Sequence, residues 1–171
     1  MTLMHTIASM RNLALHLSAL EAWPEYTVLG ATDVWVVGTS MVQVEERTGT
    51  PCVRTAAAPL MSTGAVGLDR PAHTRFVSVV VTRVQSILPH AAGDGRDVWV
   101  DAELDGCVPV LSECRVIGRR SSTRTQRVHL RPMHAQETST VLLPRDLAIG
   151  DLIAFPCAEP AALHDLRFRG A

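Results

Sequence analysis

The sequence predicts an all-β fold, namely a single closed or partly open β-barrel of Greek-key type with a short N-terminal helix. Three observations lead to this fold class. About seven short segments are rich in β-branched residues and end in turn signals, whereas helical spacing occurs in one segment only. No internal repeat or long linker divides the 171 residues, so the chain is expected to form one domain.

The N-terminal part of the chain predicts a helix followed by strands. Apolar residues recur with roughly helical spacing within residues 7–21. Pro24 ends this helix, because proline cannot continue one. The segment "TDVWVVGTSMVQVEE" at residues 32–46 is rich in β-branched residues and predicts a strand.

A hairpin is predicted in the middle of the chain. The segment "TRFVSVVVTRVQSIL" at residues 74–88 is a long β-branched run with Ser78 and Thr82 on one face. A turn, "GDGRD" at residues 93–97, follows it. The segment "VWVDAELDG" at residues 98–106 is then the returning strand.

The C-terminal part continues the strand pattern. The segments "CRVIGRR" and "QRVHLRP" flank the polar loop "RRSSTRT", and "STVLLP" follows them. A turn that ends in Gly150 and Asp151 feeds the apolar strand "LIAFP". These segments complete the strands that a barrel of this size needs.

The charge balance argues against two classes of partner. The chain has 16 Lys+Arg against 17 Asp+Glu and a formal net charge of −1. This balance gives no electrostatic reason to expect nucleic acid or an anionic membrane as a partner. No apolar run approaches the length of a transmembrane helix. We therefore expect neither partner.

Lysine and cysteine usage narrows the chemistry. All 16 basic residues are Arg, so no side chain can form the Schiff base on which pyridoxal-phosphate chemistry depends. Cys52, Cys107, Cys114 and Cys157 are scattered, without the close spacing of a disulfide framework or a zinc site. We expect free, mostly buried thiols in a reducing cytoplasm, and no cofactor.

The order of these elements resembles the β-barrel domain of the fold-type III pyridoxal-phosphate decarboxylases, the diaminopimelate and ornithine decarboxylase family. "WPEYTVLGATDVWVVGTSMVQVEERTGTPC" is similar to the family's lead-in, which ends in a helix and "GTP" before a strand. The hairpin "TRFVSVVVTRV" to "GRDVWVDAEL" is similar to its strand pair, and "LPRDLAIGDLIAFPCAEPA" with "LRFRGA" to its closing pattern. The resemblance covers residues 23–60 and 74–170.

This chain departs from that family at the catalytic domain. The family's inserted α/β barrel runs to roughly 250 residues, whereas only "AAAPLMSTGAVGLDRPAH" separates the two halves here. The Schiff-base lysine belongs to the absent barrel. Family site residues are replaced by Pro71, Ala72, Val108, Ser112, His134, Ala135 and the "EPA" segment at 159–161. The resemblance therefore implies a barrel without pyridoxal phosphate and without decarboxylase activity.

With this resemblance, the expected domain over residues 1–171 has four parts. They are an N-terminal helix at 1–22, lead-in strands at 23–60, a junction at 61–73 that replaces the inserted barrel, and the β-barrel at 74–171.

An uncovered barrel face suggests a function in catalysis. Such a face can become a mostly apolar pocket with a few polar groups. We expect a cofactor-free enzyme of specialised metabolism that cyclises, isomerises or dehydrates a small apolar organic substrate by positioning and one acid or base. The candidate residues, for each of which the alternative is a solvated loop residue, are His134, Glu137, Glu113 and Glu159.

Two other motifs are weaker. His129 and His134, with Glu137 nearby, are residue types that bind zinc. Their spacing places the two imidazoles on opposite faces of a strand, so no metal site is expected. A predicted Arg-rich hairpin is interpreted as a solvated face, with an anionic ligand or an acidic carrier protein as the alternative. Its members are Arg115, Arg119, Arg120, Arg124, Arg127 and Arg131.

The alternative function is a non-catalytic interaction module. The family dimerises with its barrel at the interface, so the resemblance implies a homodimer or a pseudoenzyme partner of a full-length decarboxylase-like protein. If the apolar strand "VSVVVTRV" at residues 77–84 were exposed, it would need such a cover or would invite aggregation. A pocket lined by the candidate residues would favour the enzyme instead.

Overall fold

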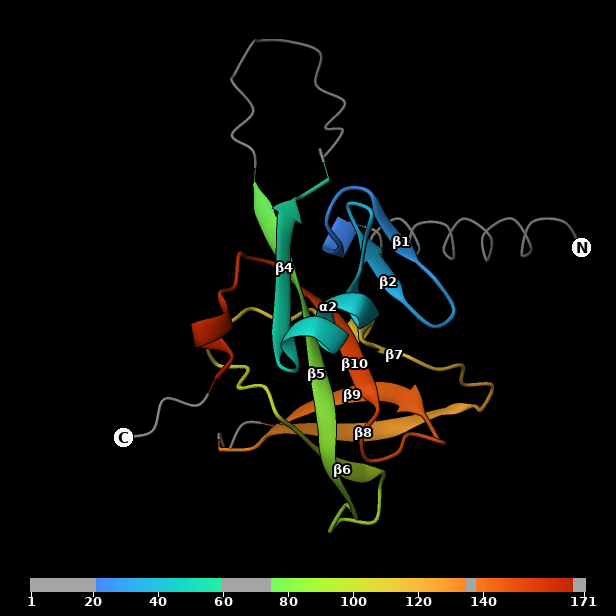
Figure 1. The fold of residues 1–171 in the computed structure, drawn as a ribbon. Coiled ribbons are helices and arrows are strands. Elements are labelled where there is room, and N and C mark those ends of the chain that lie inside the picture. The colour runs from blue at the N-terminus through green and yellow to red at the C-terminus, as the bar shows by residue number, and fades with distance from the viewer. Residues whose placement is uncertain (1–20, 60–74, 135–137, 168–171) are drawn as a thin grey trace, which may run out of the picture.

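The computed structural model describes residues 21–59, 75–134 and 138–167. The predicted N-terminal helix, apart from residues 21 and 22, and the junction at 61–73 lie outside this part of the chain. The described residues form ten strands, one α-helix and two short 3-10 helices (Figure 1). None of these helices is long and apolar enough to cross a membrane.

A seven-stranded sheet is the main element of the fold. Its strand order is β7-β10-β5-β6-β8-β9, and β4 also pairs with β5. All neighbours are antiparallel except β6 and β8, which run parallel. The strands are β4 (Cys52–Ala57), β5 (Phe76–Pro89), β6 (Arg96–Val100), β7 (Arg115–Ile117), β8 (Thr125–Pro132), β9 (Ser139–Pro144) and β10 (Leu152–Cys157).

The sheet curls into a partly open barrel. In Figure 1, β8 and β9 run across the direction of β5 and β10. Within the described residues, β7 pairs only with β10 and β9 only with β8, so the two ends of the sheet are not hydrogen-bonded to each other. The predicted all-β, partly open barrel is confirmed, and so is the predicted hairpin, which β5 and β6 form. The predicted Gly150–Asp151 turn also leads into β10, with Gly150 at φ 91°.

The central strand, β5, is shared by two sets of partners. Its N-terminal half pairs with β4 and β10, and its C-terminal half pairs with β6 after an irregularity between Val84 and Ser86. Residues 77–82 are all buried. The two polar residues among them are satisfied: Ser78 accepts a hydrogen bond from the Ala161 amide (2.9 Å), and Thr82 donates one to Asp101 (2.7 Å). Both faces of β5 are therefore covered by this chain itself.

The two faces of β5 and β10 belong to two hydrophobic clusters, as the period-2 alternation of strands requires. The inner cluster fills the barrel and is formed by Val80, Val84, Val98, Val100, Ala102, Leu104, Val128, Leu130, Val141, Leu143, Leu147, Ile153, Phe155, Cys157 and Leu166. The outer cluster is formed by Trp23, Val34, Val36, Met41, Cys52, Val79, Val81, Ile117, Leu152 and Ala154.

A small layer covers the outer cluster. It contains a three-stranded antiparallel sheet and a helix; in Figure 1 the helix crosses in front of β5, and β1 and β2 lie to the right of β4. Its elements are β1 (Thr27–Leu29), β2 (Val34–Val36), β3 (Thr39–Ser40) and α2 (Met41–Thr48). The layer buries the side chain of Trp23 and three further apolar side chains against β5 and β10.

The helix α2 corrects one prediction made from residue types. A single strand was predicted over residues 32–46, but the chain turns at Val37 and Gly38, both at positive φ, and then becomes helical. Ser40 caps the helix, because its hydroxyl accepts a hydrogen bond from the Gln43 amide (3.1 Å). The helix that the family resemblance implied before "GTP" is thus present.

The Arg-rich hairpin is a second prediction that was wrong. Strand β7 pairs with β10, whereas β8 pairs with β6 and β9, so β7 and β8 do not form a hairpin. Three of the six arginines are held by ion pairs. Arg119 forms ion pairs with both Asp146 and Asp151. Arg127 forms one with Asp94, and Arg131 forms one with Asp97.

The inner cluster provides a test of the fold. Phe155 is fully buried on β10, so Phe155→Ala should destabilise the protein by about 3–5 kcal/mol, the usual cost of a phenyl-sized core deletion. Urea unfolding followed by circular dichroism measures this. The matched control is Phe76→Ala, because Phe76 is 48% exposed at the end of β5 and should cost under about 1 kcal/mol. Equal losses in the two variants would contradict the burial pattern.

Candidate functional site

The candidate site begins with a histidine and a carboxylate that follow two parallel strands. Glu103 comes shortly after β6 and His134 shortly after β8. These strands are paired in parallel, with Val100 opposite Pro132, so the residues after their carboxyl ends lie at the same edge of the sheet. There the His134 Nδ1 atom lies 2.7 Å from Glu103 Oε1.

Glu103 is held firmly and His134 is more open. The Glu103 residue is 7% exposed, and its amide donates a hydrogen bond to the Leu166 carbonyl (2.9 Å). The side chain of His134 is 47% exposed. An ionised carboxylate can only accept hydrogen bonds, so in that form of Glu103 it is His134 Nδ1 that donates the proton. This bond fixes both the tautomer and the orientation of the ring.

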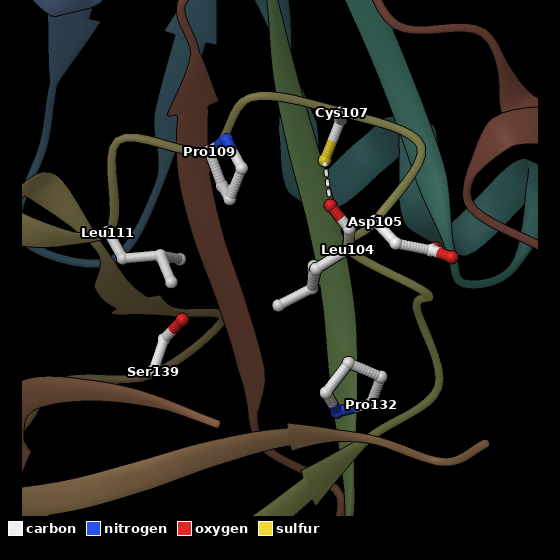
Figure 2. Close-up of a pocket in the computed structure, with 7 residues that line it drawn as sticks. All are labelled: Leu104, Asp105, Cys107, Pro109, Leu111, Pro132 and Ser139. Carbon is white, nitrogen blue, oxygen red and sulfur yellow. Dashed lines mark hydrogen bonds between the residues drawn. The ribbon is translucent and has the colours of Figure 1, made fainter. Parts of the chain in front are cut away.

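A cavity of about 370 Å³ adjoins these segments. Its wall combines four apolar residues with three polar ones, which are an acid, a thiol and a hydroxyl. Figure 2 shows Leu104 and Leu111 pointing toward the same open space, and the Cys107 thiol donating to the Leu104 carbonyl (3.4 Å). The lining residues are Leu104, Asp105, Cys107, Pro109, Leu111, Pro132 and Ser139.

The paired side chains and the cavity share the same two segments. Leu104 is the next residue after Glu103, and Pro132 lies two positions before His134. The chain that forms the cavity wall therefore also carries the histidine and the carboxylate. This arrangement can bind a small molecule with apolar contacts beside a group that gives or takes a proton.

The other predicted site residues are placed differently. Glu113 is half-buried in the 3-10 helix Leu111–Glu113, which also provides Leu111 to the cavity. Glu159 is exposed in the loop after β10. Glu137 lies outside the described residues. His134 is thus joined by a carboxylate that the sequence analysis did not single out.

Glu103 could have been found from one signal in the sequence. It stands between Ala102 and Leu104 in "VDAELDG", and both of these neighbours are buried. A carboxylate inside a buried run needs a partner, because an unpaired buried charge is costly. The sequence does not say which side chain that partner is, since His134 is 31 residues away.

A second cluster lies on β6, on β8 and just after the end of β5. The rings of His90 and His129 are stacked with centroids 3.8 Å apart. Asp97 Oδ1 lies 3.0 Å from His90 Nδ1 and accepts a hydrogen bond from Arg131 Nε (2.9 Å). The Arg131 guanidinium also lies 5.6 Å from the Trp99 ring centroid. His129 therefore belongs to this cluster and His134 to the other one.

The pKa values in the second cluster follow from burial and charge. Burial opposes the ionised form of Asp97, but the hydrogen bonds from Arg131 and His90 outweigh it and lower the pKa of this carboxyl. Burial and the neighbouring His90 lower the pKa of His129. Within the described residues, no three His, Cys, Asp or Glu side chains are grouped so as to hold a metal ion.

Comparisons with known proteins give distant neighbours. No family model matches the chain, and no curated protein matches it. Nineteen chains of solved structures match. Two are structures of the arginine decarboxylase of Paramecium bursaria Chlorella virus, one of them bound to agmatine, with TM-scores of 0.36 and 0.37 and 18% identity. The matches cover 46% of this chain and 24% of the decarboxylase, so this chain is similar to about a quarter of that protein's length.

The second cluster predicts how stability responds to acid. The folded-state pKa of Asp97 is lowered, so its contribution is present above the unfolded pKa of about 3.9 and is lost as pH falls through the folded value. We expect Asp97→Asn to be less stable than wild type at pH 7, with the difference shrinking as pH falls below about 4. Urea unfolding at a series of pH values measures this.

The control for that series is Asp105→Asn, since Asp105 is exposed and its replacement should change stability at pH 7 by no more than about 0.5 kcal/mol. A difference between wild type and Asp97→Asn that stayed constant from pH 7 to pH 2 would show that the Asp97 charge does not stabilise the fold.

Proposed function

We propose that this protein is a cofactor-independent enzyme that acts on a small, largely apolar organic molecule. The observation that carries the proposal is the hydrogen bond between His134 and the buried Glu103, on two of the segments that line the cavity. The distant decarboxylase-like neighbours do not bear on this activity. We place the enzyme in the cytoplasm, where its thiols would remain reduced.

The pair supplies acid–base chemistry in this proposal. Glu103 orients the His134 ring and stabilises the imidazolium that forms when the ring takes a proton. An imidazole ring can both take and give a proton, so the same ring can remove a proton at one carbon or oxygen of the substrate and return it at another. Isomerisation, cyclisation and dehydration all consist of such transfers once the substrate is correctly positioned.

The cavity supplies the positioning. Its volume of about 370 Å³ falls at the lower end of the range typical of small-molecule sites. Leu104, Pro109, Leu111 and Pro132 offer apolar contacts, and the Ser139 hydroxyl can orient one polar group of the substrate. Glu113, on the same 3-10 helix as Leu111, is the second candidate for proton transfer. Glu137 and Glu159 remain predictions.

Metabolite profiling of a deletion strain tests the proposal. The strain should accumulate an unrearranged precursor, and the wild-type gene should restore the product. With purified protein and that precursor, His134→Asn should lower kcat by about 10²–10⁴-fold, the usual contribution of a general acid or base. Glu103→Gln keeps the shape of the side chain but removes its charge, and should also lower kcat while changing KM little.

The matched control is His129→Asn. This histidine lies on β8 within the second cluster, so its replacement should leave turnover within about twofold of wild type. An unchanged metabolite profile in the deletion strain would contradict the proposal that this protein is an enzyme. Full activity of His134→Asn would contradict the role of His134 in proton transfer.

A non-catalytic dimerisation module is the second candidate. The sequence suggested such a module if the apolar strand at residues 77–84 were exposed. This condition does not hold, because most of this segment is buried by the chain itself. A different observation favours it: Val28 and Trp35 are cross-strand partners on β1 and β2, and they are 62% and 39% exposed. Tyr26 and Val37, which adjoin these two strands in the chain, are exposed as well. A homodimer, or a decarboxylase-like partner, would cover these side chains.

Light scattering after size-exclusion chromatography tests the homodimer. We expect twice the mass of one chain for wild type and the mass of one chain for Val28→Asp, because a carboxylate cannot be buried unpaired in an apolar interface. Leu142→Asp is the matched control, since Leu142 is also an exposed apolar strand residue but lies on β9. A monomeric wild type, or dissociation by Leu142→Asp alone, would contradict this interface.

A further inference from the structure

Two of the four thiols lie close together beside the cavity. Cys107 lines the cavity and is half-buried, so a small solute in the cavity reaches its sulfur. Cys157 ends β10 and is fully buried in the inner cluster, against which Cys107 also packs. One thiol therefore faces the cavity and the other lies behind it. All four cysteines of the chain are free.

The backbone holds these two cysteines side by side. Pro109 and Cys157 form an antiparallel bridge, and the Ala158 amide donates a hydrogen bond to the Val108 carbonyl (2.8 Å). The segment that begins at Cys107 therefore runs along the end of β10 as an additional strand would. Cys107 is thus the diagonal neighbour of Cys157 across this bridge, and the two thiols are close enough to hydrogen-bond to each other.

The four thiols differ in their pKa values. A hydrogen bond from the Cys157 thiol lowers the pKa of Cys107, and it outweighs burial and the carboxylates of Asp105 and Asp165. The same interaction raises the pKa of Cys157. Burial raises the pKa of Cys52 to about 11 and that of Cys114 to about 12. Because the thiolate is the reactive form, Cys107 is the thiol of the four that ionises, and so reacts, most readily.

We propose that Cys107 and Cys157 form a hydroperoxide-sensitive thiol pair, in which Cys107 is oxidised from the cavity and Cys157 resolves it to a disulfide. The Cys107 thiolate attacks one oxygen of the hydroperoxide, the O–O bond breaks, and the alcohol or water leaves after taking a proton. Cys107 is then a sulfenic acid. The Cys157 sulfur attacks it, the S–O bond breaks, and water leaves with the Cys157 proton.

The disulfide would change the cavity. It joins the wall at residue 107 to the end of β10 and removes the thiol from the lining. A dithiol reductant reverses the reaction by thiol–disulfide exchange. This pair is independent of the His134–Glu103 hydrogen bond, so its test does not depend on the proposed enzyme activity.

Peptide mapping of the full chain tests the thiol pair. The reduced protein is treated with hydrogen peroxide, denatured, alkylated and cleaved after arginine. Cleavage gives one peptide, residues 97–115, that contains both Cys107 and Cys114, and another, residues 146–167, that contains Cys157. We expect these peptides to be cross-linked, with two hydrogens lost and Cys52 fully alkylated. Dithiothreitol should separate them again.

Variants identify the two sulfurs. Cys114→Ala leaves Cys107 as the only thiol of its peptide, and the cross-link should form as in wild type. Cys107→Ala should abolish it. Cys157→Ala removes the resolving thiol, so Cys107 should instead be trapped as a sulfenic acid by dimedone. Circular dichroism establishes that each variant is folded before it is oxidised.

Three results would contradict the proposal that Cys107 and Cys157 form a hydroperoxide-sensitive pair. They are a wild-type protein that keeps four alkylatable thiols after peroxide, a cross-link that Cys114→Ala abolishes, and a cross-link between two protein molecules. The wild-type measurement decides the question even if a variant fails to fold.

Discussion

The fold depends on one constraint, which is that β5 and β10 are buried on both faces. All six residues of β10 are buried, as are residues 77–82 of β5. Side chains alternate across a strand, so two separate apolar layers must cover this pair of strands. The barrel interior provides one layer. The small sheet with α2 provides the other, and this is why a lead-in segment of the chain packs on the outside of the barrel.

Polar groups in this region are anchored at Asp101. Its Oδ1 atom accepts hydrogen bonds from the Thr82 hydroxyl (2.7 Å) and the Arg83 amide (2.9 Å), and its Oδ2 atom accepts one from the Thr50 hydroxyl (2.5 Å). Arg83 also pairs with Glu45 of α2. One carboxylate after β6 thus connects the central strand with the loop before β4. The same segment then continues to Glu103, so the fixed position of Asp101 also limits where the candidate site can lie.

The candidate site is a consequence of parallel pairing. In a sheet that is otherwise antiparallel, β6 and β8 run in the same direction and end at the same edge. The residues that follow them, which are not needed for strand pairing, meet there and carry polar side chains. The cavity lies at this edge because the segment from Leu104 to Leu111 leaves β6 and returns along the end of β10. Its wall therefore contains a thiol, and two of its wall residues are close in sequence to the His134–Glu103 pair.

Residue patterns alone determined most strands of the barrel, the β5–β6 hairpin and the turn before β10, because β-branched runs and glycine turns are local signals. That all 16 basic residues are Arg is likewise read from the sequence alone. Residue types alone did not predict that residues 41–48 form a helix, and in the tertiary structure Asp33 helps to fix Ser40 as its cap across the β2–β3 turn. His134 was identified from the sequence, but its partner Glu103 was not. Their contact depends on the parallel pairing of β6 and β8, and no local pattern encodes which strands become neighbours.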